Sequence, residues 1–272
     1  MEVLSYEGST GVIYRLGKGL VAKMPWPTAN EHHAEELEKA FNIEQRILEH
    51  LSLIGAPPGI IAYHGPCMIN GRKEGLLLSE ANCGDLQAYI DRENVDETLR
   101  RKWSLQIAHA VAYIHENGIV HMNLSTSNVL LHRTGQSMDA ILADFGGSRC
   151  AGLGLYGDLL PDSPFLDPRL VQLHDPSSNG SLVSLPKVDV FSLGVVIYTI
   201  MTGHYPFREG PAPGSLEENH AYNSHVQSRY RRGEFPDLSE VYFGDVIAGC
   251  CCERRFNTAK EVVAAMEAIK YK

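Results

Sequence analysis

The chain has 272 residues, of which 44% are hydrophobic, enough for a sizeable core in one large domain or two medium ones. Its 24 Lys and Arg residues against 33 Asp and Glu residues give a formal charge of −9, which disfavours nucleic acid or an anionic membrane as a general partner. The first ten residues show no signal-peptide pattern, and the longest apolar run, 190–201, is too short to cross a bilayer. We therefore expect a cytoplasmic or nuclear protein, not a secreted one, without membrane insertion.

The N-terminal third of the chain predicts a small sheet with one helix. Residues 1–23 contain three short strand patterns joined at glycine turns, and residues 59–70 and 75–79 alternate as two further strands. Between them, residues 30–51 predict a helix, because apolar residues recur at helical spacing. These apolar residues are Leu37, Phe41, Leu48 and Leu51.

One carboxylate interrupts the apolar stripe of that helix. Glu44 lies in the middle of the stripe. Because an unpaired buried carboxylate costs several kcal/mol, we expect a cation against it. A partly exposed position on the edge of the helix is the alternative.

From Leu86 onward the patterns are mainly helical. Residues 99–117 carry apolar residues at spacings of three and four before Gly118, which predicts a long helix. Residues 186–207 are apolar on all sides for about three turns, which predicts a helix buried at the centre of the lobe. Residues 148–168 show no period and contain several glycines and prolines.

The stretch 119–147, IVHMNLSTSNVLLHRTGQSMDAILADFGG, places two polar clusters between apolar strand-like runs. His121, Leu124 and Asn128 have the spacing of the H-R-D-L-x-x-x-N catalytic loop, and Asp144-Phe145-Gly146 matches the D-F-G motif. On these motifs the chain resembles the protein kinases. The resemblance covers nearly the whole chain.

The resemblance implies an α+β, two-lobed protein-kinase-like fold. A small lobe would hold a five-stranded antiparallel sheet and one helix, and a larger lobe would be mainly helical. In a single domain spanning 1–272, residues 1–80 would form the N-lobe, 81–84 the hinge and 85–272 the C-lobe. The region around Glu80 to Cys83 would bind adenine through its backbone, with Leu78 or Ser79 as the gatekeeper residue. Residues 148–168 would be the activation segment.

The resemblance also implies that ATP and Mg²⁺ bind between the lobes. Val21-Ala22-Lys23 resembles V-A-I-K, whose lysine binds the phosphates, and Glu44 would be the partner of Lys23. Gly8 and Gly11 resemble part of the glycine-rich loop, with Tyr6 at its first glycine position; two glycines are also typical of an ordinary hairpin turn. The residues implied in cofactor binding are Gly8, Gly11, Ala22, Lys23, Glu44, Glu80, Asn128 and Asp144. Asn128 and Asp144 would hold the metal.

Three residues of the catalytic loop depart from the family pattern. Asn123 stands where kinases have the aspartate that accepts the substrate hydroxyl proton, so the implied catalytic set is Asn123, Asn128 and Lys23. An amide cannot take up that proton, and a positioned base is worth about 10²- to 10⁴-fold in rate. Ser125 replaces a lysine typical of Ser/Thr kinases. Met122 replaces the arginine that receives a phosphorylated activation segment, which makes Ser148, Tyr156 and Ser163 poor candidates for a phosphorylation switch.

Two further positions concern how the helical lobe is held. Asp167-Pro168-Arg169 stands where kinases have A-P-E, whose glutamate pairs with an arginine, here Arg255. Arg169 would then leave two like charges, unless the lobe is held in another way. Asp189 would support the catalytic loop, as its counterpart does in kinases, or simply cap its own helix.

Three functions follow as alternatives. The first is a pseudokinase that binds Mg·ATP, transfers phosphate poorly or not at all, and acts as a binding or scaffolding module for a protein partner. The second is an active Ser/Thr-type protein kinase, with Asn123 either tolerated or engineered. The third is a structural module that binds no nucleotide.

Overall fold

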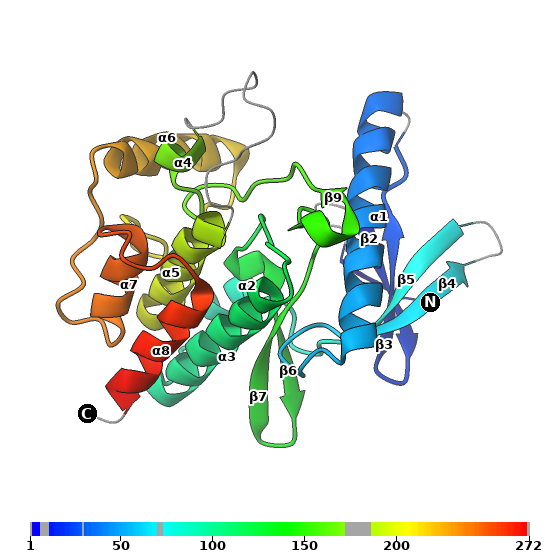
Figure 1. Cartoon of the computed structure of the whole chain (residues 1–272), viewed down its shortest axis with the longest axis horizontal. Coiled ribbons are helices and arrows are strands. Elements are labelled where there is room, and N and C mark those ends of the chain that lie inside the picture. The colour runs from blue at the N-terminus through cyan, green and yellow to red at the C-terminus, as the bar shows by residue number, and fades with distance from the viewer. Residues whose placement is uncertain (1, 6–10, 29, 70–72, 172–185, 271–272) are drawn as a thin grey trace.

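The computed structural model describes residues 2–5, 11–28, 30–69, 73–171 and 186–270. Within these ranges a small sheet lobe and a larger helical lobe lie side by side (Figure 1). The strands of the sheet lobe are antiparallel and lie in the order β1-β2-β3-β5-β4. Their bounds are Glu2–Ser5, Gly11–Gly17 and Leu20–Pro25 for β1 to β3, and Tyr63–Ile69 and Lys73–Ser79 for β4 and β5. The predicted α+β, two-lobed fold with a five-stranded sheet is confirmed.

The helix of the sheet lobe is α1, Glu31–Ile54. It begins after Asn30, whose side chain accepts a hydrogen bond from the backbone N–H of His33. It ends at Gly55, whose φ of 78° lies in the left-handed region that glycine adopts without steric cost. The predicted stripe is buried, and it contains Leu37, Phe41, Glu44, Leu48 and Leu51. The sequence pattern thus located both the helix and its buried face.

The chain between α1 and β4 differs from its prediction. We expected a strand over 59–70, but β4 begins only at Tyr63. Residues 59–61 instead pair with Leu142, which donates to the carbonyl of Gly59 at 2.9 Å and accepts from the N–H of Ile61 at 3.0 Å. Since these backbone groups are satisfied by the hairpin of the other lobe, the segment joins the lobes and does not extend the sheet.

The helical lobe contains, besides its helices, a short hairpin and the catalytic-loop region. Its helices are α2 Leu86–Ile90, α3 Glu97–Glu116, α4 Pro168–Val171, α5 Pro186–Thr202, α6 Leu216–Arg231, α7 Gly244–Cys251 and α8 Ala259–Lys270. The hairpin is β6 Val129–Thr134 with β7 Ser137–Leu142, and the short elements are η1 Thr126–Asn128, β8 Arg149–Cys150, η2 Ala151–Leu153 and β9 Leu155–Tyr156. None of the helices in the described ranges combines the length and the apolar character needed to cross a membrane.

Helix α5 is the centre of the helical lobe, as its all-round apolar pattern predicts. Every residue from Val188 to Ile200 is buried. The helix ends five residues before the predicted end at Phe207, because Gly203 has a φ of 85° and leaves the right-handed helical region. Beside it, the predicted helix α3 buries Trp103, whose indole N–H donates to the carbonyl of Met138.

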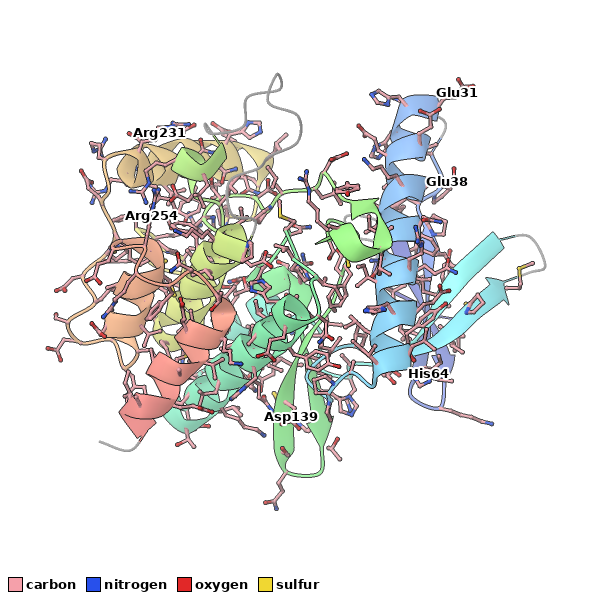
Figure 2. The ribbon with its side chains drawn as sticks, in the orientation of Figure 1. Glu31, Glu38, His64, Asp139, Arg231 and Arg254 are labelled. Atoms are coloured by element: carbon pink, nitrogen blue, oxygen red, sulfur yellow. The ribbon has the colours of Figure 1, made fainter. Side chains whose placement is uncertain are left out.

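A buried carboxylate holds the end of the activation segment. Asp167 is 1% exposed and accepts hydrogen bonds from Arg169 at 2.8 Å and from Arg254 at 2.5 Å. Arg254 lies in the loop that follows α7 (Figure 2). The expected pair of facing like charges, Arg169 and Arg255, is wrong: Arg255 binds Asp245 and Glu253 instead. One carboxylate between two guanidinium groups therefore ties the segment to the C-terminal helices.

We predict that Asp167→Asn lowers the melting temperature by several degrees. The change leaves two arginines without their shared anion; breaking a fully buried pair costs about 3–5 kcal/mol, and the partial exposure of both arginines reduces this figure. Differential scanning calorimetry would measure the shift. Glu93→Gln, which removes an exposed carboxylate, serves as the matched control. Equal melting temperatures for the two variants would contradict the role of Asp167.

Candidate functional site

The predicted pairing of Lys23 with Glu44 is present in the structure. Lys23 lies on β3 and Glu44 on the buried face of α1, and Nζ and Oε2 are 2.6 Å apart. Both side chains are almost fully buried, at 7% and 1% exposure. The alternative of a partly exposed Glu44 on the helix edge is therefore wrong.

Asp144 joins the same cation from the other lobe. Its Oδ1 lies 3.1 Å from Nζ of Lys23. The next residue, Phe145, is fully buried, and its ring packs against that of His121 with centroids 5.1 Å apart. Three chain segments, 121 residues apart at the extremes, thus meet at one lysine.

The three charged groups of this cluster shift one another's pKa values. Burial lowers the pKa of Lys23, but the Asp144 and Glu44 carboxylates outweigh burial and raise that pKa above its usual value. Burial raises the pKa of Asp144, and Lys23 outweighs it, so this pKa lies below its usual value. Burial raises the pKa of Glu44 against the attraction of Lys23. At neutral pH Lys23 is a cation and Asp144 an anion.

A carboxylate of α5 binds the backbone of the catalytic loop. The carboxylate of Asp189 accepts hydrogen bonds from the backbone N–H groups of His121 at 2.6 Å and Met122 at 2.9 Å. Met122 has a φ of 65°, a left-handed conformation that costs a non-glycine residue about 1–3 kcal/mol. His115 also contacts Asp189 at 2.9 Å. Asp189 therefore supports the loop, as the resemblance implied.

Asn123 and Asn128 lie together at the end of this loop. The side-chain NH₂ group of Asn128 donates to the backbone carbonyl of Asn123 at 2.7 Å. Oδ1 of Asn128 is therefore the group able to bind a cation. A Cβ at Gly147 would come within 3.1 Å of Cβ of Asn123 and 3.0 Å of the carbonyl oxygen of Leu159. Glycine at 147 thus lets the activation segment pass close to Asn123.

The two other departures in the loop have different surroundings. Met122 is 2% exposed and packs with Val120 and Val188 in an apolar cluster, where no charged group could be received. Ser125 precedes η1, and its carbonyl accepts a hydrogen bond from the N–H of Asn128 at 3.2 Å. Its hydroxyl cannot supply the charge of the lysine that it replaces.

The hinge region is fixed by contacts that sequence reasoning missed. The backbone N–H of Glu80 donates to the carbonyl of Gly19 at 2.7 Å, and its side chain binds Arg15 at 2.8 Å. The side chain of Asn82 donates to the backbone carbonyl of Arg133 on β6 and accepts from the backbone N–H of the same residue. Arg15 and Glu80 are 65 residues apart, so no spacing in the sequence links them.

The structure distinguishes the two possible gatekeeper residues. Leu78 is 6% exposed and belongs to the hydrophobic core. The hydroxyl of Ser79 instead bonds His64 on β4 at 2.8 Å. Leu78 is therefore the residue whose side chain points into the interior at the end of β5.

Two of the residues expected in cofactor binding, Gly11 and Ala22, lie on the paired strands β2 and β3. Ala22 is fully buried on β3. A Cβ at Gly11 would lie 2.4 Å from the carbonyl oxygen of Met24, so close pairing of β2 with β3 by itself requires glycine there. Gly8 and Tyr6 lie outside the described residues.

Comparison with known proteins agrees with this geometry. The family model described as the protein kinase domain matches residues 7–264. The chain is 36% identical to NUAK family SNF1-like kinase 2 of Rattus norvegicus over 152 residues, which are 55% of this chain and 22% of that protein. It is 29% identical to serine/threonine-protein kinase PkaA of Streptomyces coelicolor over 227 residues, 78% of this chain and 40% of that protein. These matches span less than half of either relative, and with the family model they show that the chain belongs to the protein kinase domain family.

Proposed function

We propose that this chain binds ATP with magnesium and transfers phosphate to protein hydroxyls poorly or not at all. The observation that carries the proposal is the complete Lys23, Glu44 and Asp144 assembly beside a catalytic loop that holds Asn123 instead of a carboxylate. The first feature supports nucleotide binding, and the second supports impaired transfer. The chain would then act mainly as a nucleotide-dependent binding or scaffolding module for a protein partner.

The donor set fits magnesium, which prefers oxygen ligands. The Asp144 carboxylate is 15% exposed, and Oδ1 of Asn128 is left for a cation because the amide nitrogen is already engaged. Bound magnesium would neutralise charge on the phosphates. Lys23 would bind the nucleotide phosphates while Glu44 keeps its ammonium group in position.

Adenine would bind through backbone groups of the hinge, between Ala22 and the hairpin β6–β7. Because the N–H of Glu80 already donates to Gly19, Glu80 would contribute through its carbonyl group. Gly11 would let the strand backbone lie close to the phosphates, as we propose for Gly8.

We also propose that 1–272 works as one domain, with 1–80 as the N-lobe, 81–84 as the hinge and 85–272 as the C-lobe. The protein would act in the cytoplasm or nucleus.

Catalysis would be limited by Asn123. Its amide has no basic lone pair for the hydroxyl proton, and its carbonyl oxygen would only orient the hydroxyl. The absent base corresponds to about 3 to 5.5 kcal/mol of barrier. With a serine at 125, no lysine from the loop would neutralise the transferred phosphate.

An active Ser/Thr-type kinase is the second candidate. It is favoured by the assembled Lys23–Glu44 pair and by the relative named as a serine/threonine-protein kinase. Under this candidate Asn123 is tolerated or engineered. A phosphate-transfer assay distinguishes an active kinase from a pseudokinase. The third alternative, a module that binds no nucleotide, predicts no change of melting temperature with Mg·ATP.

We predict that saturating Mg·ATP raises the melting temperature and that Lys23→Met abolishes the rise. A ligand that binds only the folded state at 100 times its Kd stabilises it by about 2.7 kcal/mol, roughly 5 to 10 °C for a chain of this size. Lys260→Met, an exposed lysine on α8, is the matched control and should keep the shift. An unmoved melting temperature in the well-folded parent at millimolar Mg·ATP would refute the nucleotide site.

Asp144→Asn should weaken ATP binding chiefly when magnesium is present. The carboxylate is a preferred oxygen ligand of this ion, whereas a neutral amide binds it weakly. Isothermal titration calorimetry with and without EDTA would measure both affinities. An equal loss of affinity under the two conditions would assign Asp144 a structural part only.

Asn123→Asp should leave the fold intact and raise the phosphate-transfer rate. The two side chains are nearly isosteric, and the carboxylate can accept the hydroxyl proton. We expect a gain within the 10²- to 10⁴-fold range of a general base, reduced by the serine at 125. Transfer from radiolabelled ATP to a generic protein substrate would be timed, with Asn94→Asp as the control. A variant that binds ATP but is no faster than the parent would show that Asn123 does not limit the reaction.

A further inference from the structure

One carboxylate of the activation segment meets cations from two other elements. Asp158 accepts a hydrogen bond from Lys39 of α1 and lies 3.6 Å from the guanidinium of Arg149 in β8. Nε of Arg149 also donates to the carbonyl of Gly157 at 2.7 Å, which holds the residue before Asp158 in place. Figure 1 shows β9, the strand that leads to Asp158, beside α1.

A second contact from α1 reaches the same segment. Arg46 donates to the carbonyl of Leu153 in η2 at 3.1 Å. Lys39 and Arg46 lie on either side of Glu44 along the helix. The activation segment therefore holds α1 at two points that flank the residue paired with Lys23.

Arg149 extends this link to the catalytic loop. Its backbone N–H and carbonyl pair with Val120 at 2.8 and 2.9 Å. Val120 directly precedes His121. The side chain of Asp158 thus links Lys39 of α1 to Arg149, whose backbone pairs with the residue that precedes the catalytic loop.

Two of the three hydroxyl side chains in this segment are buried, and the loop residue that receives a phosphate in kinases is replaced by Met122. Met122 lies in an apolar cluster and cannot receive an anion. The hydroxyls of Ser148 and Ser163 are buried and hydrogen-bonded to His121 and Gln227, whereas Tyr156 is 57% exposed. In this arrangement the anion that Arg149 and Lys39 bind is the permanent carboxylate of Asp158.

We propose that Asp158 is a positioning residue whose fixed charge holds α1, and with it Glu44, in place without phosphorylation of the activation segment. The expected effect of Asp158 on ATP affinity rests on the proposed function. Its expected effect on the position of α1 does not. Lys39 and Asp158 are 53% and 69% exposed, so their attraction is screened by salt and contributes little to global stability.

The test measures hydrogen exchange of α1 without nucleotide at low salt. Asp158→Asn should speed exchange in peptides from 31–44 by about 1.4- to fivefold, because an exposed pair contributes about 0.2–1 kcal/mol to the local opening equilibrium. Global melting should stay within about 2 °C of the parent, which separates positioning from a structural role. Glu209→Gln makes the same charge change at an exposed residue without an ion-pair partner in the described chain and should leave α1 unchanged.

A double-mutant cycle with Lys39→Met sharpens the test. The double variant should exchange no faster than either single variant, and about 1 M salt should bring the parent close to them. Additive effects, or an Asp158→Asn variant indistinguishable from Glu209→Gln, would overturn the inference.

The same variants carry a second readout. Mg·ATP affinity should fall about 1.4- to fivefold in Asp158→Asn and return in Asp158→Glu. Parent-like affinity in Asp158→Asn would overturn the coupling of Asp158 to the nucleotide site. A parent that binds no ATP would refute the proposed function while the exchange data still decide the placement of α1.

Discussion

The structure depends on one buried ammonium group placed between two carboxylates. Lys23 binds Glu44 at 2.6 Å and Asp144 at 3.1 Å, and the three side chains come from β3, α1 and the segment after β7. Buried charges are stable only when they are paired, so removing Lys23 would deprive both carboxylates of the cation that compensates their charge. The cluster therefore fixes the position of α1 and of Asp144 together.

A second and separate constraint holds the catalytic loop. Asp189 binds two consecutive backbone N–H groups and stabilises the left-handed conformation of Met122. Neither contact uses the side chain of Asn123. The loop can therefore keep its shape with an amide where proton acceptance requires a carboxylate, and fold and chemical competence are separable at this position. This separation makes a nucleotide-binding module with impaired transfer physically reasonable.

The sequence predicts what local periodicity and known motifs encode. The stripe of α1 with Glu44 in it and the all-round apolar α5 are both found as predicted, because burial leaves a repeating pattern. Contacts between distant residues leave none. Lys39 and Asp158 are 119 residues apart, and the partner of the activation-segment end is Arg254, one position from the arginine that we expected. Gly11 resembles a phosphate-loop glycine, yet close strand pairing alone already requires it.

The central claim is that nucleotide binding and phosphate transfer are uncoupled in this chain. Phosphorus NMR of one sample with Mg·ATP and a protein substrate reports both, because bound ATP shifts its resonances and transfer consumes the γ-phosphate signal. We predict bound nucleotide whose γ-phosphate is lost at least about a hundredfold more slowly than the 1–100 s⁻¹ typical of protein kinases. Turnover within that typical range, or ATP resonances unchanged by the protein, would contradict it.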